Sequence, residues 1–242
     1  MLQGCPNGAR QRGVPLTPAQ VAAEAVAMAV AGVEELHIHP KNAAGADTLD
    51  PPLVGEFVFT VRAAVPGMPI GVTTGAWAEP DPRRRIDFVR AWDPTALPDY
   101  ASVNWHEDGA LELAKALLDK GIGIEAGLFS GTSGADVLAL SGLAERMHRL
   151  LAEVIEADPL LAGGVARDHF TRLGPLARMT GRPVLLHGLD LAAWPVLRLA
   201  HELGADTRIG LEDVLVDADG RQASNASLVR SARDILRRGT PP

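Results

Sequence analysis

Short apolar runs rich in β-forming residues alternate along this chain with longer amphipathic runs rich in Ala and Leu, about eight times in succession. Repeated β–α units in a chain of 242 residues predict a parallel sheet with helices packed against it. We therefore expect a single α/β domain over residues 1–242, a (β/α)8 TIM barrel with trimmed loops. The alternative, a doubly wound open sheet, requires a topological switch point that the pattern does not show.

The two periodicities also give the expected element boundaries. Strands are predicted at residues 2–6, 35–39, 69–74, 100–104, 123–128, 150–155, 183–187 and 207–211. Helices are predicted at 17–31, 52–65, 82–92, 108–120, 133–147, 160–180, 190–203 and 224–238. Thr17, Pro18 and Gln20 form a capping-box pattern at the start of the first helix. Gly32 and Gly204 stand where glycine commonly ends a helix.

Composition narrows the possible partners. The net charge is −7, and the basic residues form only one run, 83–85, which argues against a nucleic-acid-binding protein. We read that run as a solvated helix start. The single cysteine, Cys5, excludes a disulfide within the chain and is expected to be a small buried residue. No apolar stretch is long enough to cross a membrane, and no signal-peptide pattern begins the chain, so a cytoplasmic location is expected.

Polar residues follow nearly every predicted strand. In a (β/α)8 barrel the carboxyl ends of the strands form the active-site mouth, so these residues are the first candidates for chemistry. The set comprises Asn7, His37, His39, Thr73, Thr74, Ser102, Asn104, Glu125, Glu153, His187, Arg208, Glu212 and Asp213.

His37 and His39 are the most specific signal in this set. Residues two apart on a strand point to the same side, so both imidazoles can reach one point. Glu212, from the other end of the chain, can add a carboxylate, and two His with one carboxylate are a common open zinc site. The alternative is a barrel without metal, in which the two histidines are hydrogen-bonded internally.

Other motifs allow a plainer structural interpretation. Thr73-Thr74-Gly75 is compatible with ordinary turn chemistry, and His187 with a hydrogen bond to backbone. The loop 130–134 lacks the Lys of a phosphate-binding loop and is expected to be a flexible connection. Trp194 is expected in the core. Four histidines lack ligand spacing and are expected at the surface: His106, His148, His169 and His201.

Several of these segments together resemble the β-keto acid cleavage enzymes. Thr17-Pro18, an Ala-rich helix and His37-Ile38-His39 are similar to the opening of that family. Residues 102–105, Ser-Val-Asn-Trp, resemble its Gly-Ser-x-Asn-aromatic segment. The second half carries further matching segments, Val-Leu-Leu-His-Gly at 184–188, Ala-Trp-Pro at 193–195, Asp-Thr-Arg-Ile-Gly-Leu-Glu-Asp at 206–213, Asp-Gly at 219–220 and Ser-Asn-Ala at 224–226.

The resemblance implies a (β/α)8 barrel with a catalytic Zn²⁺, held by His37, His39 and Glu212. It implies condensation of a β-keto acid with acetyl-CoA, giving acetoacetate and an acyl-CoA. Asp213 is then the candidate general base and Arg208 the group that orients it. The expected substrate contacts are Thr73, Thr74, Ser102, Asn104, Glu125 and His187. Relatives are tetramers, so we expect a homo-oligomer whose partners are small molecules, with no nucleic acid and no membrane.

The chain departs from the family pattern at several points. The acidic residue expected near the first strand is absent, with Gln3 or Asn7 in that region, and Leu189-Asp190 follows His187-Gly188 where relatives often have Glu-Gly. Threonine replaces serine in the third-strand turn. These changes bear on the acyl substrate and the use of CoA and leave the metal ligands intact. The rival functions are a metal-dependent hydrolase or aldolase acting on a keto acid without CoA, and a non-catalytic barrel that keeps metal for structure.

Overall fold

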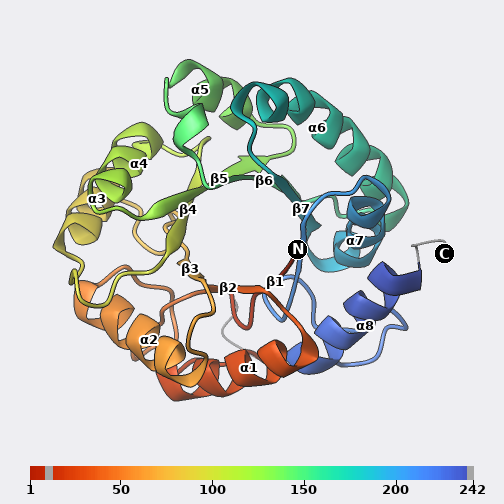
Figure 1. Ribbon diagram of the computed structural model, residues 1–242, viewed down its shortest axis with the longest axis horizontal. Coiled ribbons are helices and arrows are strands. Elements are labelled where there is room, and N and C mark those ends of the chain that lie inside the picture. Colours follow the sequence, from red (N-terminus) through yellow and green to blue (C-terminus); the bar gives the residue numbers. More distant parts are fainter. Residues whose placement is uncertain (9–12, 239–242) are drawn as a thin grey trace.

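A computed structural model describes residues 1–8 and 13–238 of this chain. Eight parallel strands surround a central axis and eight helices form an outer ring, as Figure 1 shows in a view along the barrel. The strands are β1 (Leu2–Gly4), β2 (Glu35–Ile38), β3 (Ile70–Val72), β4 (Tyr100–Asn104), β5 (Gly123–Phe129), β6 (Arg149–Val154), β7 (Val184–Gly188) and β8 (Thr207–Ile209). The predicted (β/α)8 barrel is therefore confirmed.

The strand order is β7-β6-β5-β4-β3-β2-β1-β8, so β1 lies between β2 and β8. A parallel bridge between Leu185 and Asp206 joins β7 to the segment before β8. The Thr207 hydroxyl donates to the Leu186 carbonyl at 2.9 Å across the same seam. These contacts close the ring, and an open doubly wound sheet is excluded.

The helices follow their strands in sequence order. They are α1 (Pro18–Ala31), α2 (Pro51–Ala64), α3 (Pro82–Ala91), α4 (Ala110–Asp119), α5 (Gly134–Leu140), α6 (Pro159–Thr180), α7 (Ala193–Glu202) and α8 (Asn225–Arg238). The capping box is confirmed: the Thr17 hydroxyl accepts from the Gln20 N–H, and the Gln20 side chain accepts from the Thr17 N–H. Gly32 caps the end of α1 in the left-handed conformation.

The predicted helix 133–147 is wrong in its second half. The α-helix ends at Leu140, and a separate 3-10 turn covers Ala144–Arg146. Gly142 between them has φ of 72°, a left-handed conformation that a continuing helix does not accommodate. Ser141 contributes to the break, because its hydroxyl donates to the Leu138 carbonyl.

Two predictions about surface residues are also wrong. Arg85 is buried, and its guanidinium donates to Glu107 at 2.7 Å and to the Asp108 carbonyl, so the run 83–85 is not simply solvated. His169 is buried on α6 and its Nε2 lies 2.8 Å from the Leu128 carbonyl. The predicted burial of Cys5 and Trp194 is confirmed. Within residues 1–8 and 13–238, no helix is both long and apolar enough to span a membrane.

Candidate metal centre at the barrel mouth

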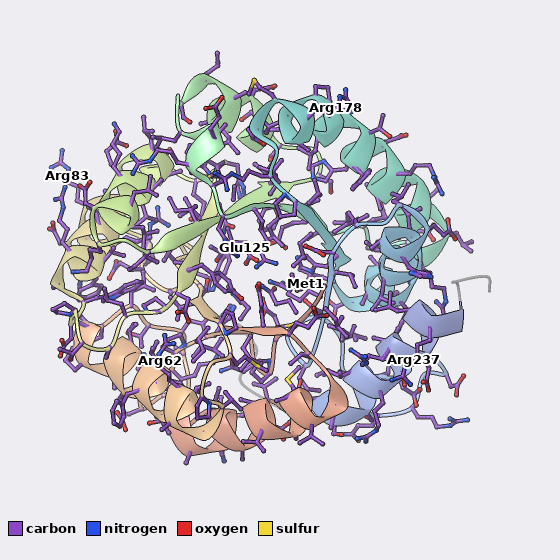
Figure 2. All side chains as sticks on the ribbon, viewed as in Figure 1. Met1, Arg62, Arg83, Glu125, Arg178 and Arg237 are labelled. Carbon is purple, nitrogen blue, oxygen red and sulfur yellow. The ribbon has the colours of Figure 1, made fainter. Side chains whose placement is uncertain are left out.

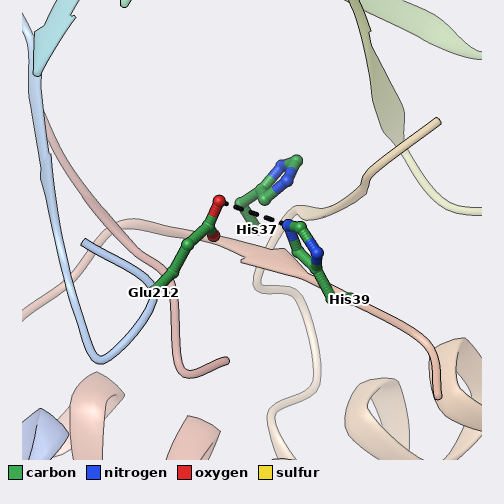
Figure 3. Close-up of side chains that lie close together, drawn as sticks. All are labelled: His37, His39 and Glu212. Atoms are coloured by element: carbon green, nitrogen blue, oxygen red, sulfur yellow. Dashed lines mark ion pairs between the residues drawn. The ribbon is translucent and has the colours of Figure 1, made fainter. Parts of the chain in front are cut away.

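The two histidines and Glu212 converge at the carboxyl end of the barrel, from β2 and β8, the strands on either side of β1. His37 is the third residue of β2, His39 directly follows the end of that strand, and Glu212 lies just beyond β8. One potential ligand atom from each residue lies within 4.8 Å of the others. Figure 3 shows the three side chains directed toward one another, with His39 Nε2 3.2 Å from Glu212 Oε1.

The atoms that face this point lack conventional partners. His37 Nδ1, His39 Nε2 and Glu212 Oε2 are buried and make no hydrogen bond of normal geometry. Buried polar atoms rarely remain in that state without a compensating ligand. Two imidazole nitrogens and one carboxylate oxygen are a donor set that fits a divalent transition metal, Zn²⁺ above all.

Asp47 orients His39 from behind. Its Oδ2 lies 2.6 Å from His39 Nδ1 and also accepts from Trp77 Nε1 at 2.8 Å, while Lys41 pairs with its other oxygen. A carboxylate on Nδ1 favours the tautomer that leaves the Nε2 lone pair for a metal. No local pattern marks Asp47 in the sequence, since it comes from the loop after β2 and not from a strand end.

Asn7 fixes the backbone on which His39 stands. Its Oδ1 accepts from the His39 N–H at 3.0 Å, and its Nδ2 donates to the His39 carbonyl at 2.8 Å. Nearby, Gly8 lies against Glu212: a Cβ at position 8 would come within 2.4 Å of Glu212 Cγ. The close approach of glycine therefore helps to place the carboxylate beside β1.

Electrostatics favour the ligand forms of His37 and Glu212 and oppose that of His39. Burial lowers the pKa of His37 well below its ordinary value, so that imidazole is neutral at physiological pH. For Glu212, burial is outweighed by Arg208 and His39, and its pKa falls, which keeps the carboxylate ionised. Burial also opposes a charge on His39, but Glu212 and Asp47 raise its pKa to about 9. A metal at Nε2 would compete with that proton.

Arg208 bridges Glu212 and Asp213. Its Nη2 lies 3.2 Å from Glu212 Oε1, and its Nε and Nη2 each lie 3.2 Å from Asp213 Oδ1. The Cys5 thiol donates to Asp213 Oδ2 at 2.8 Å, and Asp213 is fully buried. Asp213 is thus held from both of its oxygens, which fixes its orientation relative to the metal ligands.

His187 and Glu153 form a second charged pair at the mouth. His187 Nε2 lies 2.7 Å from Glu153 Oε2, and its Nδ1 lies 3.4 Å from Asp213 Oδ1. Burial and the neighbouring Arg208 oppose a charge on His187, yet Glu153 and Asp213 outweigh them and raise its pKa to about 9. A line of titratable groups therefore connects Glu153, at the pocket surface, to Asp213.

The other predicted substrate contacts lie on β4 and beside β3. The Thr74 hydroxyl donates to the Ser102 carbonyl at 2.5 Å, and Asn104 donates to Glu107 at 2.8 Å. The Thr73 hydroxyl oxygen accepts from the Gly75 N–H and retains its own proton for donation. All four of these predicted side chains, Ser102 included, are buried at or near the mouth.

Glu125 lies deeper than its predicted place at a strand end. It is the third residue of the seven in β5, and Figure 2 shows it near the barrel axis. Its carboxylate accepts from Gln3 at 2.9 Å and lies 3.1 Å from Arg149 Nε and 3.6 Å from His37 Nδ1. Glu125 therefore connects the barrel interior to the base of the metal centre.

A pocket of about 290 Å³ opens above these groups. It is lined by His39, Trp77, Phe129, Glu153, Leu189, Asp190, Arg208 and Glu212. Trp77 and Phe129 were not predicted as site residues, because Trp77 lies in a loop and Phe129 at the end of β5, and neither aromatic residue carries a spacing signal. Such a concave, partly apolar space with convergent charged groups is typical of a small-molecule site.

Comparison with solved structures shows the same barrel in ObcA. The apo form of ObcA is 17% identical with a TM-score of 0.71, over 94% of this chain and 62% of that one. A complex of ObcA with oxaloacetate is 18% identical with a TM-score of 0.70, over 94% of this chain and 64% of that one. A ternary complex of ObcA with a C4-CoA adduct and oxalate is 18% identical with a TM-score of 0.71, over 93% of this chain and 64% of that one. The chain thus spans less than two thirds of the length of ObcA.

A dihydropteroate synthase from Xanthomonas albilineans shares the fold more distantly, with 15% identity and a TM-score of 0.55 over 99% of this chain and 94% of that one. No curated protein matches the sequence. A family model, in contrast, matches residues 2–240, nearly the whole chain. On that match, the chain belongs to the β-keto acid cleavage enzyme family.

Proposed function

We propose that this chain is a Zn²⁺-dependent β-keto acid cleavage enzyme, which condenses a β-keto acid with acetyl-CoA to give acetoacetate and an acyl-CoA. The observation that carries the proposal is the convergence of His37, His39 and Glu212 on one point beside a pocket. Family membership supports the reaction class. The oxaloacetate and C4-CoA adduct of the ObcA complexes support small keto acids and CoA compounds as reactants.

The metal ligands follow from the donor set. His37, His39 and Glu212 would hold the ion, with Asp47 behind His39 and Arg208 beside Glu212. When bound, a divalent ion acts as a Lewis acid that stabilises negative charge developing on a substrate carbonyl oxygen.

The carboxylate of the keto acid is assigned to the hydroxyl and amide groups of Thr73, Thr74, Ser102 and Asn104. Thr73 has a proton to donate, and Asn104 is oriented by its bond to Glu107. Glu125 and His187 are proposed to line the site, Glu125 from the barrel interior and His187 from β7. Their contacts would fix the substrate so that its reacting carbon faces Asp213.

Asp213 is the proposed general base. It accepts a proton from the carbon next to the carbonyl, and Arg208 keeps the carboxylate oriented during that transfer. His187 and Glu153 offer a route by which the proton could later leave toward the pocket, since they lie between Asp213 and the pocket surface.

Three further expectations remain part of this proposal: a single catalytic domain over residues 1–242, a homo-oligomeric assembly and a cytoplasmic location. Oligomeric state is measurable directly by light scattering of the purified chain.

Metal content and turnover test the proposal together. We expect about one zinc per chain in the wild type by plasma mass spectrometry, and acetyl-CoA-dependent loss of a β-keto acid. His39→Ala should lose both the metal and turnover while keeping the fold, because the ligand lies at the mouth and outside the packed barrel. His106→Ala, an exposed histidine, is the matched control. Full metal content in His39→Ala would contradict the ligand assignment, and keto acid loss without acetyl-CoA would favour the hydrolase or aldolase alternative.

A further inference from the structure

A second hollow of about 230 Å³ lies beside the pocket at the barrel mouth. It is lined by Ile155, Glu156, Ala157, Leu189, Asp190 and Leu191, which come from the segments after β6 and β7. Leu189 and Asp190 also line the pocket beside the metal centre. The two spaces therefore lie side by side, with Leu189 and Asp190 between them, and we refer to the second as the side groove.

The walls of the side groove are fixed by the fold. The Leu189 N–H donates to the Val154 carbonyl at 3.1 Å, which ties the loop after β7 to the end of β6. Asp190 has φ of 51°, a left-handed conformation that non-glycine residues seldom adopt, and its N–H donates to the Asp213 carbonyl at 2.6 Å. Backbone strain of this kind occurs preferentially at ligand sites.

Large apolar side chains are exposed around this groove. Ile155 is 53% exposed and Leu191 is 62% exposed, although both line the hollow. Leu160 and Leu161, at the start of α6 on the same end of the barrel, are 90% and 57% exposed. An apolar patch next to a binding pocket indicates a ligand or partner that covers it.

Charge narrows the choice of ligand. The charged residues that line the side groove are acidic, Glu156 and Asp190, and no Lys or Arg of residues 1–8 and 13–238 belongs to its lining. Arg208, at the adjoining pocket, is engaged with Glu212 and Asp213. The phosphates of CoA would find no Lys or Arg in this lining to pair with, whereas an uncharged alkyl chain would bury Ile155, Leu189 and Leu191.

We propose that the side groove receives the alkyl arm of the β-keto acid, so that the preferred substrates carry an unbranched apolar chain of several carbons on the ketone. This inference rests on the proposed function, and it adds the substrate class. With the keto acid head at the metal centre, the arm would leave the pocket past Leu189, one of the two residues that both spaces share.

A homologous substrate series tests the proposal. We would measure kcat/KM with saturating acetyl-CoA for three β-keto acids whose ketone carries an ethyl, propyl or pentyl group. We expect about a threefold rise per added methylene, slightly below the roughly fourfold that complete burial of a methylene gives. A flat or falling series would overturn the assignment.

Paired variants locate the effect. In Ile155→Ser/Leu191→Ser we expect the pentyl-to-ethyl ratio of kcat/KM to fall by about tenfold, because the apolar walls are lost. Val30→Ser/Leu140→Ser is the matched control, since these side chains are 86% and 88% exposed on α1 and α5 and should leave the ratio unchanged.

A rise in KM for acetyl-CoA with an unchanged ratio would assign the groove to the co-substrate. A change only in oligomeric state would assign it to a second copy of the chain. Either result overturns the proposal.

Calorimetric binding separates this proposal from the proposed function. The three keto acids would be titrated into zinc-loaded wild type and into the groove variant, without acetyl-CoA. Binding that strengthens with chain length in the wild type alone supports the side groove even if no turnover is found. Turnover without any dependence of binding or kcat/KM on chain length supports the proposed function and contradicts the assignment of the side groove to the alkyl arm.

Discussion

The two ends of the barrel use charged residues in opposite ways. At the amino end, Arg149 pairs with Glu35 and lies 3.1 Å from Glu125, while Gln3 and Tyr100 hydrogen-bond within the same cluster. Each strong charge there faces an opposite charge or a hydrogen-bond donor. At the carboxyl end, His37, His39 and Glu212 instead bring two imidazoles and a carboxylate together, with one potential ligand atom of each within 4.8 Å of the others.

This difference separates stability from binding. A buried cluster that is internally paired keeps the barrel closed and offers nothing to a ligand. A cluster whose donor atoms converge is incomplete until something occupies the space between them. In this fold, residues at the amino end commonly serve stability and those at the carboxyl end chemistry.

Removing the central cation of the amino-end cluster should have the largest effect on stability. Arg149→Met leaves Glu35 and Glu125 buried without their counter-charge, and we expect the free energy of unfolding to fall by about 3–5 kcal/mol. Urea unfolding measures this, with the exposed Arg84→Met as control. Metal content of the folded fraction should be unchanged; loss of metal with normal stability would erase the distinction between the two ends.

Asp213→Asn tests the opposite end. The amide keeps the shape and loses the ability to take a proton, so turnover should fall by roughly a hundredfold or more, the scale of a lost general base. Zinc content should stay near one per chain, because Asp213 is not among the three converging ligands. Wild-type rates in this variant would assign the base to another residue.

Asp47→Asn should have an intermediate effect on the metal. The amide no longer supplies a negative charge to His39 Nδ1, and we expect zinc affinity to weaken by about 10- to 100-fold, as for other carboxylates behind a ligating histidine. A competitive chelator titration gives the affinity. Asp219→Asn, whose side chain is 67% exposed, is the control, and equal affinities in the two variants would remove Asp47 from the metal centre.

The smallest effect concerns His169, which belongs to neither end. Burial lowers its pKa, so near pH 6 the imidazole is protonated to a greater extent in the unfolded chain than in the folded chain. The contribution of the neutral His169 imidazole to the free energy of unfolding is present above pH 6.5, and it is lost as the pH falls toward the pKa of His169 in the folded chain. His169→Gln should reduce the slope of stability against pH by less than about 1.4 kcal/mol per pH unit, the limit for one proton. Parallel wild-type and variant curves between pH 5 and 7 would show that His169 titrates normally.

The ring and the candidate histidine pair could be predicted because their signals are local. Each β–α unit has its own periodicity, and His37 and His39 are two residues apart on one strand. The partners that complete both clusters could not be predicted in this way. Asp47 reaches His39 from a loop, and Arg149 meets Glu35 from 114 residues away, so only the closed barrel brings them together.

The same geometry explains the errors. Arg85 was expected in solvent because a run of arginines is usually hydrated, but the neighbouring loop supplies Glu107 as a buried partner. His169 lacked any ligand spacing, yet α6 presents it to the Leu128 carbonyl at the end of β5. Pairing between distant segments, and not local pattern, decides the fate of such isolated polar residues.

The position of β1 between β2 and β8 would give the proposed metal centre a role in assembly. His37 and His39 are borne by or next to β2, and Glu212 follows β8, so the three ligands meet only after the last strand has docked beside the first. Metal uptake during refolding would therefore report ring closure, and an intermediate that lacks β8 would bind zinc weakly. By mass action the ion would then favour the closed barrel over every open precursor, joining the two ends of the sequence without a covalent link.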